Sequence, residues 1–299
     1  MSYAAWIAVD WGNSNLRLWA MGPDGPIAER KAPQGTLALP GPEAYEPALL
    51  ALAGDLIAPD RKTMVLICGA VGALGGWVEA PYRQLPCVPL GAGEFTSPEV
   101  KDPRLDLRIL PGLNQARPPA ILRGEETQAA GFLVSEPDFD GILCLPGTHT
   151  KWMHISAGEV VSFLSFMTGE LFRFLADASV LRFTTARAGF DEAAFLDAVS
   201  DAISRPERMA SGLFPLRAEA VLAGLDPVVA RSRLMGLLLG AELAAARMQW
   251  LGRDVVVIGG AEMAAAYATA LEAQGVAVRR FDGDKAALMG LIEAHRLMA

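Results

Sequence analysis

Apolar residues in the first part of the chain fall into short runs separated by turn-forming residues. The runs at 3–9 and 16–21 flank the turn Asp10-Trp-Gly-Asn-Ser-Asn, which predicts two strands joined as a hairpin. Helical spacing over 43–56 predicts a helix, and the short run 63–68 predicts a buried strand. This part of the chain is therefore expected to form a mixed α/β unit.

The middle of the chain repeats the opening pattern. Residues 81–120 are rich in proline and weakly periodic, so short strands and long loops are expected there, before a helix that begins near Gly124. A strand from Gly141, a turn at 147–151 and a return strand through 156 then form a second predicted hairpin. Two units that each open with strand, turn and strand indicate a duplicated architecture.

Helical spacing dominates the last part of the chain. It predicts helices near 170–181, 191–203, 207–223, 227–249 and 285–298, with strands at 255–258 and 277–281 and a helix from about 261. The expected organisation is an N-terminal lobe over 1–138, a C-terminal lobe over 139–284, and a final helix over 285–299 that packs back on the N-terminal lobe.

Composition narrows the functional classes. The chain has 299 residues, 52% hydrophobic and 20% charged, which is enough apolar material for two cores. A net charge of −8 argues against a nucleic-acid partner. The best candidate for a membrane span, 234–248, is too short for a bilayer and carries Glu242. No leader pattern opens the chain, so a cytoplasmic protein with no membrane partner is expected. Cysteine and histidine spacing predicts neither a disulfide nor a zinc site.

The first turn has the chemistry of a phosphate and magnesium site. Asp10 ends a buried strand and is placed to face a magnesium ion, while Gly12, Asn13, Ser14 and Asn15 would offer backbone N–H groups to an anion. Arg17 on the return strand would neutralise charge on a transferred phosphoryl group. The alternative is an ordinary hairpin whose aspartate caps its own turn.

The second turn repeats this logic, and a late glycine pair adds a third element. The second turn offers amides, hydroxyls and a lysine to phosphate through Gly147, Thr148, His149, Thr150 and Lys151. Gly259 and Gly260 end a strand and precede a helix, which would let a nucleotide lie against bare backbone. Each element alone is equally compatible with ordinary hairpin or turn structure.

Together, the segments 7–17, 143–151 and 255–260 resemble the phosphate-1, phosphate-2 and adenosine motifs of the actin, heat-shock chaperone and sugar-kinase superfamily. The resemblance implies an α/β fold of two ribonuclease-H-like (actin-like ATPase) domains with a cleft between them that binds ATP and Mg²⁺. No G-x-x-x-x-G-K-[ST] or G-x-G-x-x-G motif supports another nucleotide-binding fold.

A closer resemblance covers nearly the whole chain. The segments IAVDWGNSNLRLW, GGWVEAPY, RGEETQAAG, LCLPGTHTKW and SFMTGELF are similar to those of 2-dehydro-3-deoxygalactonokinases. The resemblance implies ATP-dependent phosphorylation of the 6-hydroxyl of 2-dehydro-3-deoxy-D-galactonate in galactonate catabolism. Asn13 replaces the usual threonine, and Ala70 and Ala73 replace an expected methionine and serine, which leaves a related acceptor such as 2-dehydro-3-deoxygluconate open. A nucleotide-dependent switch of the same fold is the alternative from another class.

The resemblance also implies catalytic roles for the acidic pair before the second hairpin. Related enzymes place an acidic residue there to take the proton from the attacking hydroxyl, and Glu126 is the first choice for this base. Glu125 and Asp10 are the competitors. The alternative is a structural role, in which the two acidic residues stabilise the first turn of a helix.

The predicted acceptor side combines an anion site with a sugar-binding wall. Arg123 is the first candidate for the substrate carboxylate and Arg83 the second. Trp77, Glu79 and Tyr82 resemble a sugar-binding wall, with a buried core tryptophan as the alternative. By resemblance, Thr168 and Glu170 border the cleft, or they only cap a helix. The expected partner is a small sugar acid, and a homodimer is left open.

Overall fold

The computed structural model describes residues 3–298. They divide into two compact units: the first contains 3–140, 155–163 and 281–298, and the second contains 141–154 and 164–280. This division differs from the predicted lobes at residues 139–140, 155–163 and 281–284, all of which belong to the first unit. At 155–163, Cys87 and Val160 form a β-bridge, and the side chain of Gln115 accepts the backbone N–H of Phe163 at 2.9 Å.

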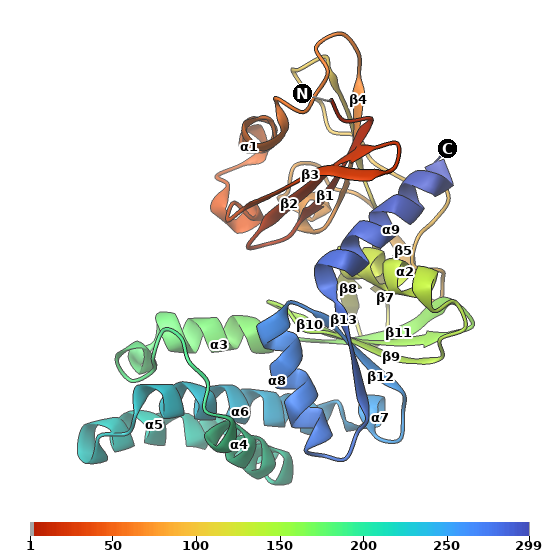
Figure 1. Cartoon of the computed structure of the whole chain (residues 1–299). Helices are drawn as coiled ribbons and strands as arrows, with labels where there is room; N and C mark the ends of the chain where they lie inside the picture. Colours follow the sequence, from red (N-terminus) through yellow and green to blue (C-terminus); the bar gives the residue numbers. More distant parts are fainter. Residues whose placement is uncertain (1–2, 299) are drawn as a thin grey trace. The chain divides into compact units, whose positions relative to one another are not determined.

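The first unit is built on a five-stranded sheet in the order β3-β2-β1-β4-β6 (Figure 1). Its strands are β1 (Trp6–Trp11), β2 (Leu16–Gly22), β3 (Gly25–Ala32), β4 (Thr63–Cys68) and β6 (Leu105–Ile109). Strands β1, β2 and β3 are antiparallel neighbours, whereas β4 runs parallel to both β1 and β6. The register pairs Asp10 with Arg17 on one side and with Cys68 on the other. Neighbouring strands thus bring these three residues together at one end of the sheet.

The second sheet has the same strand order, β11-β10-β9-β12-β13. Its strands are β9 (Gly141–Leu145), β10 (Thr150–Ser156), β11 (Glu159–Phe166), β12 (Val255–Gly259) and β13 (Val278–Asp282). In both sheets, three strands that are consecutive in sequence lie side by side, and two strands from later in the chain extend the sheet beyond the first of them. The duplicated architecture predicted from the two hairpins is confirmed. Strand β11 was not among the predicted elements.

A small third sheet, β5-β7-β8, occupies the proline-rich region of the first unit. Its strands are β5 (Tyr82–Gln84), β7 (Gly112–Gln115) and β8 (Ala120–Leu122). Short 3₁₀ helices lie at Thr36–Ala38, Pro42–Ala44, Ala70–Gly72, Val180–Phe183 and Pro206–Arg208.

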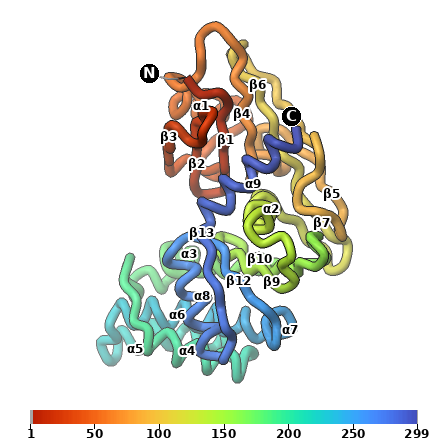
Figure 2. The backbone as a smooth tube through the Cα atoms, turned by 45° about the vertical axis from the view of Figure 1, so that its right-hand side comes forward, coloured from red at the N-terminus to blue at the C-terminus, as the bar shows by residue number. Residues whose placement is uncertain are grey.

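Two helices that are far apart in sequence pack closely in the first unit, which also contains α1 (Tyr45–Ala53). Both views show α2 (Glu125–Ser135) beside α9 (Gly283–Met298) (Figures 1 and 2). A Cβ atom on Gly131 would lie 1.9 Å from the Ala286 carbonyl oxygen, and one on Gly290 would lie 1.9 Å from the Thr127 carbonyl oxygen. The two glycines therefore allow an approach of the helices that any larger residue would prevent.

The second unit is mainly helical outside its sheet. Its helices are α3 (Thr168–Asp177), α4 (Glu192–Ser204), α5 (Met209–Ala223), α6 (Pro227–Ala245), α7 (Arg247–Trp250) and α8 (Ala261–Glu272). Figure 2 shows α4 and α5 against α6. The predicted helix 227–249 is divided into α6 and α7, and the indole N–H of Trp250 donates to the Leu243 carbonyl at 2.8 Å across the division. Within residues 3–298, no helix is long and apolar enough to cross a membrane.

Candidate active site

Asp10 lies at the end of β1 and is only 7% exposed. Burial raises the pKa of its carboxyl group, while the charge of Arg17 and a contact with Cys68 act in the opposite direction. The Cys68 thiol lies 3.9 Å from Asp10 Oδ1, and Arg17 Nη2 lies 3.7 Å from Asp10 Oδ2. The first unit thus holds a nearly buried carboxylate with a cation beside it.

The turn after Asp10 is held by a neighbouring segment of the first unit. The Gly12 N–H donates to the Asn15 carbonyl at 3.0 Å and closes the turn. The Thr36 N–H donates to the Gly12 carbonyl at 3.0 Å, and the Thr36 hydroxyl donates to Asn13 Oδ1 at 3.1 Å. Asn13, the departure from the family pattern, therefore helps to fix the turn through its side chain. Ser14 is partly buried and Asn15 is exposed.

Arg17 has a second carboxylate partner that the sequence did not reveal. Its Nη1 pairs with Oδ1 of Asp284, in the first turn of α9, and Oδ2 of Asp284 lies 2.8 Å from Lys31 Nζ. These residues are far apart in the sequence and meet only because α9 packs beside the first sheet. The result is a row of alternating charges that ends at Asp10.

Two glycines bring the start of α2 against the end of the first sheet. Gly69, directly after β4, has a φ of 103°, and a Cβ atom on it would lie 2.5 Å from the Trp11 carbonyl oxygen. Gly124, with a φ of 100°, packs against Gly69, and its own Cβ would lie 3.1 Å from Gly69 Cα. Both positions require the left-handed conformation and the close approach that glycine permits. They place the acidic pair of α2 near Asp10.

Glu126 is 1% exposed in the first turn of α2. Both its carboxylate oxygens accept the Gly124 N–H at 2.8 Å, and the Thr127 hydroxyl donates to Oε1 at 3.2 Å. Burial, and then the charge of Glu125, raise the pKa of Glu126 from its ordinary value of 4.5 to about 7. Burial, and then the charges of Asp10 and Glu126, raise the pKa of the Cys68 thiol. Both carboxyl groups therefore act on one thiol.

Glu125 differs from its neighbour in exposure and partner. It is only partly buried, and Oε2 accepts the backbone N–H of Arg123 at 2.9 Å. In this position Glu125 fastens the segment before the helix, as a capping carboxylate does. Of the two acidic residues, Glu126 has the environment typical of a general base that works near neutral pH.

Arg123 connects two of the segments that resemble 2-dehydro-3-deoxygalactonokinases, GGWVEAPY and RGEETQAAG. Its Nε donates to the Tyr82 hydroxyl at 3.0 Å, its Nη2 donates to the Ala80 carbonyl, and its guanidinium lies 3.9 Å from the Tyr82 ring centroid. Among the described residues, its buried Nη1 has no hydrogen-bond partner, and it lies close to Gly72. These contacts make Arg123 a clamp on the loop before β5. Its predicted bond to the substrate carboxylate remains a prediction.

The other predicted acceptor residues of the first unit have different surroundings. Trp77 is 8% exposed, stacks on Tyr45 and meets the edge of Trp11, so it belongs to the core of the first unit. Glu79 is exposed. Arg83 pairs with Glu94 at 3.2 Å and donates to the Val88 carbonyl at 2.8 Å, so its known contacts are structural.

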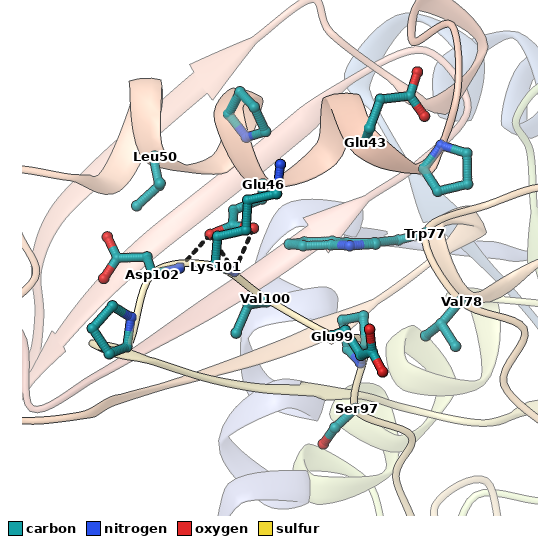
Figure 3. A pocket seen from close by; sticks show the side chains of 14 residues that line it. Glu43, Glu46, Leu50, Trp77, Val78, Ser97, Glu99, Val100, Lys101 and Asp102 are labelled. Carbon is teal, nitrogen blue, oxygen red and sulfur yellow. Dashed lines mark hydrogen bonds between the residues drawn. The ribbon is translucent and has the colours of Figure 1, made fainter.

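A pocket of about 950 Å³ lies between the region of α1 and residues 97–103 of the first unit, with Trp77 at its wall (Figure 3). The Glu46 carboxylate accepts the backbone N–H groups of Lys101 and Asp102 across one side. The lining carries four carboxylates, those of Glu43, Glu46, Glu99 and Asp102, against one lysine, Lys101. An acidic lining disfavours an anionic sugar acid, so this pocket is a poor acceptor site.

The second hairpin is fixed by the start of α3. A Cβ atom on Gly169 would lie 2.0 Å from the Gly147 carbonyl oxygen, and the Glu170 N–H donates to the Thr148 carbonyl at 2.9 Å. Glu170 Oε2 also lies 2.5 Å from His149 Nε2. Glu170 thus holds the turn itself, through its backbone and its side chain.

A buried carboxylate on α6 ties together the elements around this hairpin. Glu242 is 3% exposed and accepts hydrogen bonds from Trp152 Nε1 at 2.8 Å, the Tyr267 hydroxyl at 2.9 Å and the Thr168 hydroxyl. The Thr150 hydroxyl lies 2.7 Å from that of Tyr267. The side chains of Thr150 and Thr168 therefore face the interior of the second unit. Burial raises the pKa of Glu242, and its three donors act against this shift.

Lys151 also lies inside the second unit. It is 6% exposed, and its Nζ donates to the Ser165 hydroxyl at 3.0 Å. The second turn is thus supported from inside the unit by the side chains of Thr150, Thr168 and Lys151. The predicted contacts of these residues with nucleotide or substrate remain predictions. The sequence signal that could have revealed the network was Glu242, one acidic residue in an otherwise apolar helix.

The second unit contains a pocket of about 520 Å³ whose lining includes Glu262 and Met263, in the first turn of the helix that follows the late glycine pair. It lies among α3, α6, α8 and residues 187–192. Its lining combines apolar side chains such as Met263 and Phe190 with polar ones, which are Arg187, Glu192, Arg231, Ser232, Glu262 and Thr269. A Cβ atom on Gly260 would meet nothing within 4 Å, whereas one on Gly259 would lie 3.4 Å from the Pro146 carbonyl oxygen. The backbone at Gly260, where α8 begins, is therefore open to a ligand.

Comparison with known proteins identifies the family. A sequence model of the 2-keto-3-deoxy-galactonokinase family matches residues 10–294. A protein of Rhizobium meliloti (strain 1021), named as a probable 2-dehydro-3-deoxygalactonokinase, is 38% identical, and the match covers 97% of this chain and 96% of that protein. The 2-dehydro-3-deoxygalactonokinase of Escherichia coli (strain K12) is 31% identical, with 96% of each chain covered.

A solved structure agrees with the sequence comparisons. A crystal structure from Sinorhizobium meliloti, described under the same activity, superimposes with a TM-score of 0.87 at 38% identity over 97% of this chain and 96% of that chain. The predicted fold, that of the actin-like ATPases and sugar kinases, is confirmed. The chain belongs to the 2-keto-3-deoxy-galactonokinase family.

Proposed function

We propose that this protein transfers the γ-phosphoryl group of ATP to the 6-hydroxyl of 2-dehydro-3-deoxy-D-galactonate. Family membership supports the kinase activity and the acceptor class. The observation that carries the chemistry is Glu126, a buried carboxyl group with a pKa of about 7. A base with this pKa is ionised in a large fraction of molecules at neutral pH and can still accept a proton from an alcohol as it attacks phosphorus.

The nucleotide contacts proposed for the second unit use its turn and its pocket. The pocket beside α8 has apolar walls for a base and polar side chains, Arg231 and Glu262 among them, for hydrogen bonds. The open backbone at Gly260 would lie against the nucleotide, and the N–H groups of the 147–151 turn would face its phosphates.

The first unit is proposed to supply Asp10 and Arg17 to the phosphoryl group. Within residues 3–298, no group of three or more His, Cys, Asp or Glu side chains is arranged to hold a metal ion. A single carboxylate nevertheless suits Mg²⁺, which in kinases is held largely by phosphates and waters and keeps only one or two protein ligands. Asp10 would be that ligand, and the ion would neutralise charge on the phosphates.

The test is a substrate panel with product analysis. ADP release is measured with 2-dehydro-3-deoxy-D-galactonate, its gluconate epimer and a galactonate lacking the keto group, and the product is examined by phosphorus NMR. The proposal expects the highest kcat/KM with the galactonate-derived keto acid and a phosphate monoester on C6. Preference for the gluconate epimer, or phosphate on another oxygen, would contradict it.

A further inference from the structure

Arg17 lies between two carboxylates of different character. Its Nη1 pairs with Asp284 Oδ1, while its Nη2 is 3.7 Å from Asp10 Oδ2. The side chain of Asp10 is 10% exposed, whereas that of Asp284 is 34% exposed. Asp284 thus takes one guanidinium nitrogen and only the other faces Asp10, so Arg17 does not close on the buried carboxylate with both nitrogens.

Loss of the Asp284 charge would leave Asp10 as the nearer carboxylate for Arg17. A guanidinium binds a carboxylate through two parallel N–H bonds, and a closed pair of this kind occupies both oxygens. Attraction between opposite charges is also stronger at a nearly buried site than at an exposed one. Arg17 without Asp284 would therefore move onto Asp10.

We propose that Asp284 is a positioning residue that keeps Arg17 from closing on Asp10, so that the Asp10 carboxylate stays open to a nucleotide-bound divalent cation. The inference rests on the proposed function, which assigns Asp10 to that cation. It extends the site to the first turn of α9. Asp284 acts through Arg17 and not by touching the substrate.

A purely structural role accounts poorly for Asp284. Exposed ion pairs contribute little to stability, and the side chain of Lys31, the second partner of Asp284, is 56% exposed. The first turn of α9 has a separate cap, because the Lys285 N–H donates to Asp282 Oδ1 at 2.7 Å. Asp282 is exposed and two residues away, so it offers a matched control for the loss of one negative charge at this helix start.

The experiment measures Mn²⁺ binding to the full chain by electron paramagnetic resonance, with ADP in excess over its measured Kd for each protein. The proteins are wild type, Asp284→Asn, Asp284→Glu, Asp282→Asn, Arg17→Met and the Arg17→Met/Asp284→Asn double variant. Asp284→Asn is expected to weaken Mn²⁺ binding about tenfold, the size of one charge interaction near a partly buried site. Asp284→Glu and Asp282→Asn are expected to stay close to wild type.

The double variant separates positioning from a general structural effect. If Asp284 acts through Arg17, removing Arg17 must cancel the effect of Asp284→Asn, so the double variant should bind Mn²⁺ at least as tightly as wild type. An Asp284→Asn protein with wild-type affinity, or a double variant as weak as Asp284→Asn alone, would overturn the inference. Absence of Mn²⁺ binding in the wild-type ADP complex would instead contradict the proposed role of Asp10.

Discussion

The start of α2 and the middle of α6 each bury a glutamate, but the two carboxyl groups have opposite surroundings. Glu242 is 3% exposed and accepts three side-chain hydrogen bonds, from Trp152, Thr168 and Tyr267. Glu126 is 1% exposed, and its partners are all local: the backbone N–H groups of Gly124 and of Glu126 itself and the hydroxyl of Thr127, with the charge of Glu125 beside them. A buried carboxyl group whose donors come from three distant elements ties those elements together, whereas one with local donors and a like-charged neighbour is suited to exchange a proton.

The largest expected effect is on catalysis by Glu126. Glu126→Gln keeps the shape and the acceptor oxygen for Gly124 but cannot take a proton, so kcat should fall by roughly 10²–10⁴-fold while KM for the sugar acid changes little. Steady-state kinetics measure both constants. Glu125→Gln is the matched control and should lower kcat far less. Wild-type kcat in Glu126→Gln would show that another group is the base.

The second effect concerns stability at Glu242. Glu242→Ala leaves the donors of Trp152, Thr168 and Tyr267 without their acceptor inside the second unit, and the free energy of unfolding should fall by about 3–5 kcal/mol. Urea unfolding followed by tryptophan fluorescence measures the change. Glu242→Gln retains one acceptor oxygen and should be less destabilising. Equal stability of Glu242→Ala and wild type would contradict the view of Glu242 as a structural tie.

The smallest effect is a pH dependence of stability that Glu126 produces. The pKa of Glu126 is about 7 in the folded protein and 4.5 ordinarily, so the unfolded chain ionises first as pH rises. Stability attributable to Glu126 is therefore complete below pH 4.5 and is lost as pH rises through 7, by about 3 kcal/mol in total. Glu126→Gln should match wild type near pH 5 and exceed it near pH 8.5.

Unfolding free energies of both proteins at the two pH values provide the measurement. A constant difference between Glu126→Gln and wild type from pH 5 to 8.5 would mean that the pKa of Glu126 is not raised. In the same range, kcat of wild type should increase with pH and level off above 7, because the ionised carboxylate is the active form.

The sequence predicted those parts of the fold whose pattern is local. Strand β4 was predicted at its observed bounds, because its apolar run is uninterrupted, and α2 begins at Glu125, beside the predicted start at Gly124. Strand β6 was not recognised, although Leu105–Ile109 alternates in burial, because it lies in a proline-rich stretch and depends on pairing with β4. Pairing between distant strands leaves little trace in a short segment.

In the candidate site too, residues in local motifs could be predicted from the sequence, and residues that depend on distant partners could not. Asp10 and Glu126 could be selected from the sequence because each belongs to a short motif. Asp284 could not, because its partners Arg17 and Lys31 are more than 250 positions away and no spacing rule links them. The inward orientation of Thr150 and Thr168 was hidden for the same reason, since their partners lie on α6 and α8.

The packing of α9 beside α2 has a consequence for the order in which the protein is made. The first unit takes residues 281–298 from beyond the second unit in the sequence. A growing chain on the ribosome therefore has all residues of the second unit before it can complete the first. Until then, Gly131 and Thr127 lack the helix that covers them, and Arg17 lacks Asp284. The first strand to be synthesised thus belongs to the unit that is finished last.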